Sequence, residues 1–466
     1  VSGGNNTAIG KDALTALTSG ASNVAVGSAA LDANTTASFN VGVGFSSLGA
    51  NTTGDRNVAL GYEAMFTNTV GDRSVAIGMQ ALYTQNPASN ADMNNIAIGH
   101  AAAFSTTTGT NNTAIGTSAL FANTSGTNGV AVGKDALLSN TTGAQNTAVG
   151  TSSLDANTTG QFNVALGQSA LGGNSTGSNN TGLGRGAMEA NTTASNNTAV
   201  GYNTLAANTT GTQNVAVGAF ALDANTTANN NTVVGYNALS ANTTGTANTA
   251  IGTAALNANS TADNNTGVGM NALLVNTTGT PNTAVGSFSL QSNTTGDANT
   301  ALGSSALQEN TTGSNNTALG RSALILNTTG FQNVAVGTFT LDAITTGNSC
   351  TGVGYAALSA NTANNCSAFG TNALIANTSG VDNNAFGAAS LAANTTGLRN
   401  QAFGVSSLQS NTTGEGNNSF GYAALSANTT ADNNSAFGHN ALLANTTGTE
   451  NSAVGAFALD ANTTGI

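Results

Sequence analysis

A motif of 17 residues recurs from one end of the chain to the other, and no other feature of the sequence restricts the fold as strongly. The glycine that closes each N-x-A-V-G block recurs 27 times between Gly10 and Gly455. The spacing is 17 residues, apart from one repeat that lacks a residue and a four-residue insertion between Gly78 and Gly99. Regular repetition of this kind predicts one repeat domain over residues 1–466, interrupted by the insertion.

Numbered from its first Asn, the unit reads N-[TV]-A-[VIL]-G-x-x-A-L-x-x-N-T-T-G-x-x. It is too short for a helical repeat, which needs about 33 residues, and its Gly and N-T-T-G turn would interrupt a helix. Alternation over positions 1–5 predicts a short strand with positions 2 and 4 on one face and positions 1, 3 and 5 on the other. A second short strand is expected near positions 7–12. The sequence therefore predicts an all-β fold, a parallel β-solenoid of 27 coils with two short strands per coil.

Charged residues make up only 6% of the chain, which stacking explains. In a solenoid each repeat position lies about 4.8 Å from its copy in the next coil, so like charges would repel all along the stack. Amides and hydroxyls can instead form hydrogen bonds along it. The Asn residues at position 1 are therefore predicted to form a ladder, represented by Asn180, Asn197, Asn214 and Asn231.

Two positions carry the large apolar residues, and both are predicted to be buried. At position 9 the expected column includes Leu205, Leu222 and Leu239. At position 4 it includes Val200, Val217, Val234 and then five successive aromatic residues, Phe369, Phe386, Phe403, Phe420 and Phe437, expected as a stacked aromatic core. Position 3 is almost always Ala or Gly; it is interpreted either as a contact between chains or as a requirement of the coil's own geometry.

Cys350 and Cys366 replace the position-1 Asn in adjacent coils. Stacking would place their Cα atoms about 5 Å apart, within the range of a disulfide. Two interpretations stay open: a disulfide within or between chains, or two small residues tolerated in the Asn ladder. The frequent N-T-T triplets match the acceptor pattern for N-glycosylation, and they equally suit a turn with an Asn and Thr ladder.

Several classes of function are excluded by composition and spacing. Seven Lys and Arg against 19 Asp and Glu cannot form the basic face of a nucleic-acid-binding protein, and no apolar run approaches the about 20 residues of a membrane span. His100 and His439 lie too far apart to share a metal, and no Ser-His-Asp arrangement is evident. We expect no enzymatic activity, no catalytic residues, no cofactor and no metal site.

The repeat also resembles known families. The blocks Asn112–Gly116 and Asn214–Gly218 resemble repeats in the head domains of trimeric autotransporter adhesins, whose unit is shorter. The stretch Asn146–Gly160 resembles repeat arrays of phage tail-fibre-like proteins. This resemblance implies a left-handed parallel β-roll, wound as a homotrimer and projecting from a cell or virion.

The predicted function is a non-enzymatic, extracellular structural fibre, either an adhesin shaft or a self-assembling surface filament. Its expected partner is itself, as a trimer or an end-to-end polymer, with a host surface or glycan contacted through a tip outside this segment. Because both ends fall inside the repeat, we expect a processed product or a segment of a longer protein. The alternative is a protein that binds ice or another crystal surface through Thr and Asn ladders.

Overall fold

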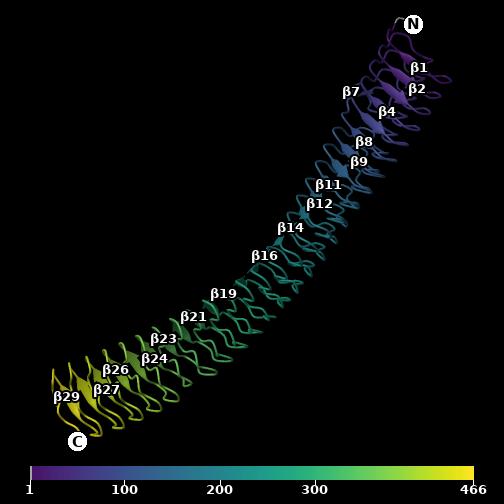
Figure 1. The fold of residues 1–466 in the computed structure, drawn as a ribbon. Coiled ribbons are helices and arrows are strands. Elements are labelled where there is room, and N and C mark those ends of the chain that lie inside the picture. The colour runs from purple at the N-terminus through teal and green to yellow at the C-terminus, as the bar shows by residue number, and fades with distance from the viewer. Residues whose placement is uncertain (1–2, 466) are drawn as a thin grey trace. The chain divides into compact units, whose positions relative to one another are not determined.

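A computed structural model describes residues 3–465. The chain forms two compact units, Val1–Asn231 and Thr232–Ile466, and each is a stack of coils with parallel strands (Figure 1). No helix occurs among the described residues. The predicted all-β parallel β-solenoid is therefore confirmed for each unit.

The first unit has one three-residue strand per coil and one additional pair of two-residue strands. Its strands are β1 (Thr7–Ile9), β2 (Val24–Val26), β3 (Val41–Val43), β4 (Val58–Leu60), β5 (Gly71–Asp72), β6 (Val75–Ile77), β7 (Ala91–Asp92), β8 (Ile96–Ile98), β9 (Thr113–Ile115), β10 (Val130–Val132), β11 (Thr147–Val149), β12 (Val164–Leu166), β13 (Thr181–Leu183), β14 (Thr198–Val200) and β15 (Val215–Val217).

The second unit follows the same plan. Its strands are β16 (Thr232–Val234), β17 (Thr249–Ile251), β18 (Thr266–Val268), β19 (Thr283–Val285), β20 (Thr300–Leu302), β21 (Thr317–Leu319), β22 (Val334–Val336), β23 (Thr351–Val353), β24 (Ser367–Phe369), β25 (Asn384–Phe386), β26 (Gln401–Phe403), β27 (Asn418–Phe420), β28 (Ser435–Phe437) and β29 (Ser452–Val454).

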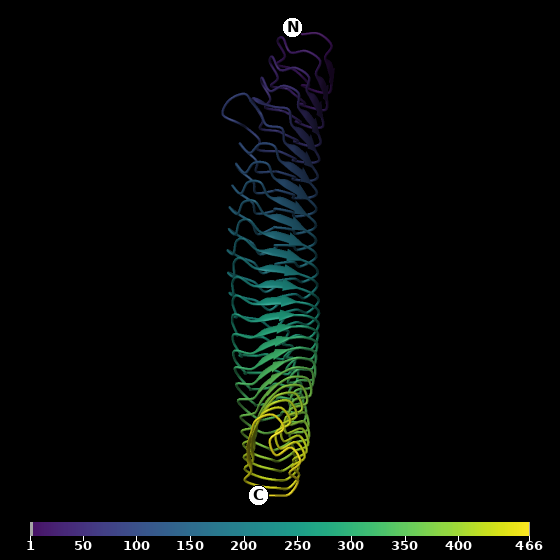
Figure 2. The ribbon, with the colours of Figure 1, turned by 90° about the vertical axis from the view of Figure 1, so that its left-hand side faces the viewer.

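Within each unit, the three-residue strands of successive coils pair with one another, and the same repeat positions face each other. In the first unit Thr181 lies opposite Thr198, and in the second unit Thr266 lies opposite Thr283. Figure 2 shows the strands of successive coils side by side. Identical side chains therefore form columns within each unit, as the repeat predicts.

The insertion between Gly78 and Gly99 forms the loop that stands out from the first unit in Figure 2. Its return segment supplies β7, which pairs with β5. An ion pair between Arg73 and Asp92 joins the same two segments. The insertion leaves the main sheet unbroken because β6 pairs directly with β8.

The prediction of a second strand near positions 7–12 is wrong. Positions 7 and 9 have a left-handed backbone, as in Ser152 with φ 52° and Leu154 with φ 51°. A strand requires a negative φ throughout, so this part of the coil is a run of turns. Apart from the two coils that also carry β5 or β7, each coil thus has a single strand, at positions 2–4.

Leu at position 9 fills the interior of the coil. Leu205 and Leu222 in the first unit and Leu239 in the second have no exposed surface, so their predicted burial is confirmed. In the coil that follows the insertion, Ala103 takes this position and is also buried. The small residues at positions 3 and 8 pack around the column, since Ala199 and Ala221 are fully buried too.

The prediction that position 4 is buried is wrong, because the strand presents its other face to the interior. Ala at position 3 points inward, whereas Val200, Val217 and Val234 at position 4 point outward and are half-buried or exposed. The strand takes this orientation because the interior has room only for small side chains. A Cβ added to Gly182 at position 3 would lie 3.3 Å from Cγ of Leu171. The interior therefore admits little more than a methyl group at most position-3 sites, and the interpretation of position 3 as a contact between chains is also wrong.

The Asn ladder at position 1 is confirmed in the first unit. The backbone N–H groups of Asn197, Asn214 and Asn231 donate to the side-chain oxygen one coil earlier, at 2.9–3.0 Å. The Asn180 amide nitrogen donates to the Ala194 carbonyl at 2.8 Å and so closes its own coil. All four ladder residues are buried.

Candidate functional site

The outer strand face is the surface formed by positions 2 and 4 of every strand. Position 4 always carries Val, Ile, Leu or Phe, and position 2 carries Thr, Val, Ile or a small or amide-bearing polar residue. Much of this surface is accessible, since Leu166 is 50% and Leu302 is 45% exposed. Neither position has a charged side chain in any repeat. Each unit therefore presents an apolar, uncharged column along its sheet.

A row of threonines runs beside the apolar column in part of the second unit. Six successive strands begin with Thr on the outer strand face, at Thr232, Thr249, Thr266, Thr283, Thr300 and Thr317. Their position-4 partners are all aliphatic, from Val234 to Leu319. This segment combines a regular row of hydroxyl and methyl groups with a parallel apolar row.

The five Phe residues at position 4 of β24–β28 form a stack, but they do not form a core. Neighbouring rings lie 4.5–4.9 Å apart with interplanar angles of 4–10°. Their column lies on the outer strand face, where Phe437 is 41% exposed. The predicted stacking of Phe369, Phe386, Phe403, Phe420 and Phe437 is thus confirmed, whereas their predicted burial is wrong.

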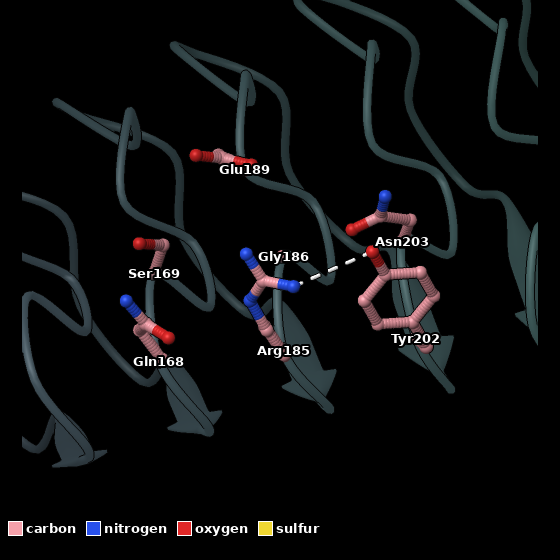
Figure 3. A pocket seen from close by; sticks show the side chains of 7 residues that line it. All are labelled: Gln168, Ser169, Arg185, Gly186, Glu189, Tyr202 and Asn203. Carbon is pink, nitrogen blue, oxygen red and sulfur yellow. Dashed lines mark hydrogen bonds between the residues drawn. The ribbon is translucent and has the colours of Figure 1, made fainter.

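A polar hollow lies beyond the carboxyl ends of β12, β13 and β14 in the first unit (Figure 3). Its volume is about 130 Å³. Its lining residues are Gln168, Ser169, Arg185, Gly186, Glu189, Tyr202 and Asn203. The Arg185 guanidinium donates to the Tyr202 hydroxyl at 3.4 Å and lies 5.6 Å from the centre of that ring.

The hollow forms because small residues occupy positions that carry larger side chains in other coils. Gly186 is the single glycine at position 7 among all the repeats, and a Cβ there would lie 2.4 Å from the Asn203 side-chain oxygen. Glu189 occupies position 10, and the neighbouring coils carry only Gly172 and Ala206 at that position. The prediction from sequence missed this site; the lone position-7 glycine was the available signal.

The two cysteines are buried and free, so no disulfide joins them within the chain. Each thiol instead points to a main-chain carbonyl, Cys350 to Ala363 and Cys366 to Gly380, both at 3.2 Å. These carbonyls belong to position 15, which the position-1 Asn side chain contacts in other coils. A hydrogen bond with the Cys350 thiol and burial both raise the pKa of Cys366. The second interpretation, small residues standing in an Asn ladder, describes the geometry.

The Asn residues of the N-T-T triplets are buried, except Asn462 in the last coil. Asn208 donates to the Asn191 side-chain oxygen at 3.0 Å and to the Gly211 carbonyl at 2.9 Å. Because its amide is used within the coil, it cannot carry a sugar in the folded chain. The interpretation of these triplets as a turn and ladder is therefore the one that the structure supports.

The histidines and acidic residues of the described part of the chain do not gather at one place. Within residues 3–465, no group of three or more His, Cys, Asp or Glu side chains could hold a metal ion. His439 stacks on Tyr422 with ring centres 5.2 Å apart, and His100 belongs to the other unit. In the described part of the chain, no helix is long and apolar enough to cross a membrane.

Neither a scan against protein-family models nor a search of curated proteins finds a match to this chain. The resemblance to adhesin and tail-fibre repeats thus rests on the repeat sequence, and it stays a prediction.

Proposed function

We propose that this chain is a non-enzymatic structural shaft that assembles with further copies of itself through the outer strand face. The observation that supports this proposal is the uncharged apolar column at position 4, which recurs in every coil and points away from the interior. A solvated sheet face usually alternates with polar residues, and large exposed apolar patches mark interaction surfaces. A second copy of the same face supplies the matching apolar surface.

The size of the column makes such an assembly energetically reasonable. Covering a half-exposed Val or Leu contributes roughly 1 kcal/mol per coil, at about 25 cal/mol per Å². Thirteen three-residue strands in the first unit repeat that contribution. The sum is comparable with or above the about 4–15 kcal/mol that association costs in lost translational and rotational freedom.

The proposed setting is extracellular, as a cell-surface appendage or virion fibre. The repeat resemblance supports this setting, together with the left-handed winding and the trimer that it implies. The scarcity of ion pairs agrees with a role that does not depend on charge, since four are found among residues 3–465.

Electron microscopy of the purified full chain tests the proposal by giving the number of chains in each cross-section. We expect particles that contain two or more coil stacks side by side. Particles with a single coil stack at all protein concentrations would overturn the proposal.

The threonine row of β16–β21 favours a second candidate function, binding to ice or to another crystal surface. Six consecutive outward Thr residues lie in a regular row beside an aliphatic row. A thermal-hysteresis assay distinguishes the two functions. Depression of the freezing point without a change in the melting point would favour ice binding, and its absence at millimolar protein would exclude it.

A further inference from the structure

Four planar polar side chains surround the hollow at Gly186. Gln168, Arg185, Glu189 and Asn203 come from three successive coils and line the same space (Figure 3). Each ends in a flat amide, guanidinium or carboxylate group with two or more hydrogen-bonding atoms. Such groups match two adjacent hydroxyls on one molecule, because both partners present paired oxygen or nitrogen atoms at similar spacing.

Arg185 and Glu189 are the two charged residues that line the hollow, and together they give it no net charge. Arg185 is held by Tyr202, and no ion pair within 4.0 Å joins it to Glu189 among the described residues. One cation and one anion therefore line the same space without neutralising each other directly. An uncharged ligand with both donors and acceptors satisfies both groups, whereas an ion would satisfy one and be repelled by the other.

The size of the hollow limits the ligand. A volume of about 130 Å³ suits one small ring better than an extended chain. Tyr202 is 41% exposed and gives the site an aromatic wall that an apolar ring face can contact.

We propose that this hollow binds a neutral pyranose sugar unit, through adjacent hydroxyls held by Arg185, Glu189 and Asn203. The site uses positions 6, 7 and 10 of the repeat, whereas the proposed assembly uses positions 2 and 4. Binding of sugar and self-association are therefore independent, and failure of one leaves the other unaffected.

Saturation-transfer NMR of the full chain with glucose, galactose and mannose, each at about 10 mM, tests the proposal at the affinity expected of a small open site. We expect transfer to at least one hexose. A disaccharide that ends in the same hexose shows whether the ligand is a free sugar or the end of a glycan chain. Equal transfer signals from the hexose and the disaccharide indicate recognition of a single unit, and a stronger signal from the disaccharide indicates a glycan chain end. Absence of transfer to every sugar would overturn the proposal.

The decisive variant is Gly186→Ser, because Ser occupies position 7 in many other coils, for example at Ser152 and Ser169. The added side chain fills the hollow and should weaken binding by at least about tenfold. Ala254→Ser makes a comparable change at position 7 of another coil and should leave binding unchanged. Unchanged binding in Gly186→Ser, or a stronger signal with glucuronate than with every neutral hexose, would contradict the proposal.

Discussion

The side-chain oxygen of Asn180 accepts a hydrogen bond of 3.0 Å from the backbone N–H of Asn197, the residue that occupies the same place one coil later. Each Asn in this column therefore contacts its own copy, and both residues are buried. An aspartate in the same place would put a negative charge next to another at every coil. This relationship explains why a chain of 466 residues can fold with so few charges.

Removal of one ladder amide should have a local effect. In Asn197→Ala, the Asn214 N–H loses its acceptor, which lies at 2.9 Å in the native chain. A buried donor without a partner costs about 1–3 kcal/mol. Native-state hydrogen exchange should show faster exchange of the Asn214 amide, while the exposed substitution Thr193→Ala changes stability by less than about 0.5 kcal/mol. Unchanged protection of Asn214 would contradict the ladder.

The left-handed backbone at position 9 should discriminate between residues of equal size. Leu205 has φ 52°, a conformation that is a genuine outlier for β-branched residues. Leu205→Ile should therefore destabilise the chain by about 1–2 kcal/mol more than Leu205→Met, although both usually cost less than about 1.5 kcal/mol in a core. Chemical denaturation measures both variants, and equal midpoints would show that position 9 is not left-handed.

The same residues show what could and could not be predicted from sequence. The repeat predicts the coil, the parallel register and the Asn ladder, because these follow from periodicity alone. Alternation of residues does not show which strand face points inward when one face carries Ala and the other Val, so the prediction that Val200 is buried is wrong. The false second strand had a signal against it, because no Val, Ile or Thr occurs at positions 7 and 9 despite their abundance elsewhere.

The candidate sites were harder to predict than the fold. The hollow depends on one absent side chain at Gly186 and on small neighbours at Gly172 and Ala206, which come from three different coils. The free thiols of Cys350 and Cys366 depend on side-chain direction, which a Cα spacing does not give. The hollow and the free thiols both arise where residues differ from the repeat consensus. The period of the repeat does not predict the structural effect of such a difference.

Mild acid should stabilise the chain. Burial is the main cause that raises the pKa of Asp155 and of Asp223. For a carboxyl whose folded pKa exceeds its unfolded value near 3.9, the stabilisation is complete below that value and is lost as the pH rises through the raised pKa. The thermal midpoint should therefore be higher at pH 4 than at pH 7. In the double variant Asp155→Asn and Asp223→Asn the pH dependence should be weaker; a wild-type midpoint that falls on acidification would be the opposite result.

Glycosylation should separate buried from exposed acceptors. Asn208 is buried at position 12, whereas Asn196, in the triplet Asn196-Asn197-Thr198, is exposed. Treatment of the folded chain with an oligosaccharyltransferase and a lipid-linked sugar should modify only exposed sites such as Asn196, and denaturation should open Asn208. Peptide mass spectrometry reads both sites, and sugar on Asn208 of the folded chain would disprove its burial.

The mass of the particle in solution tests most directly whether the outer strand face joins copies of the chain. Sedimentation equilibrium should give a multiple of the chain mass of 45.2 kDa. Val200→Lys with Val268→Lys, one position-4 charge in each unit, should shift the mass toward a single chain. Thr193→Lys with Thr278→Lys, which adds the same charges at exposed position 14, should not. A wild-type mass of one chain at every concentration, or equal dissociation of both variants, would contradict the account.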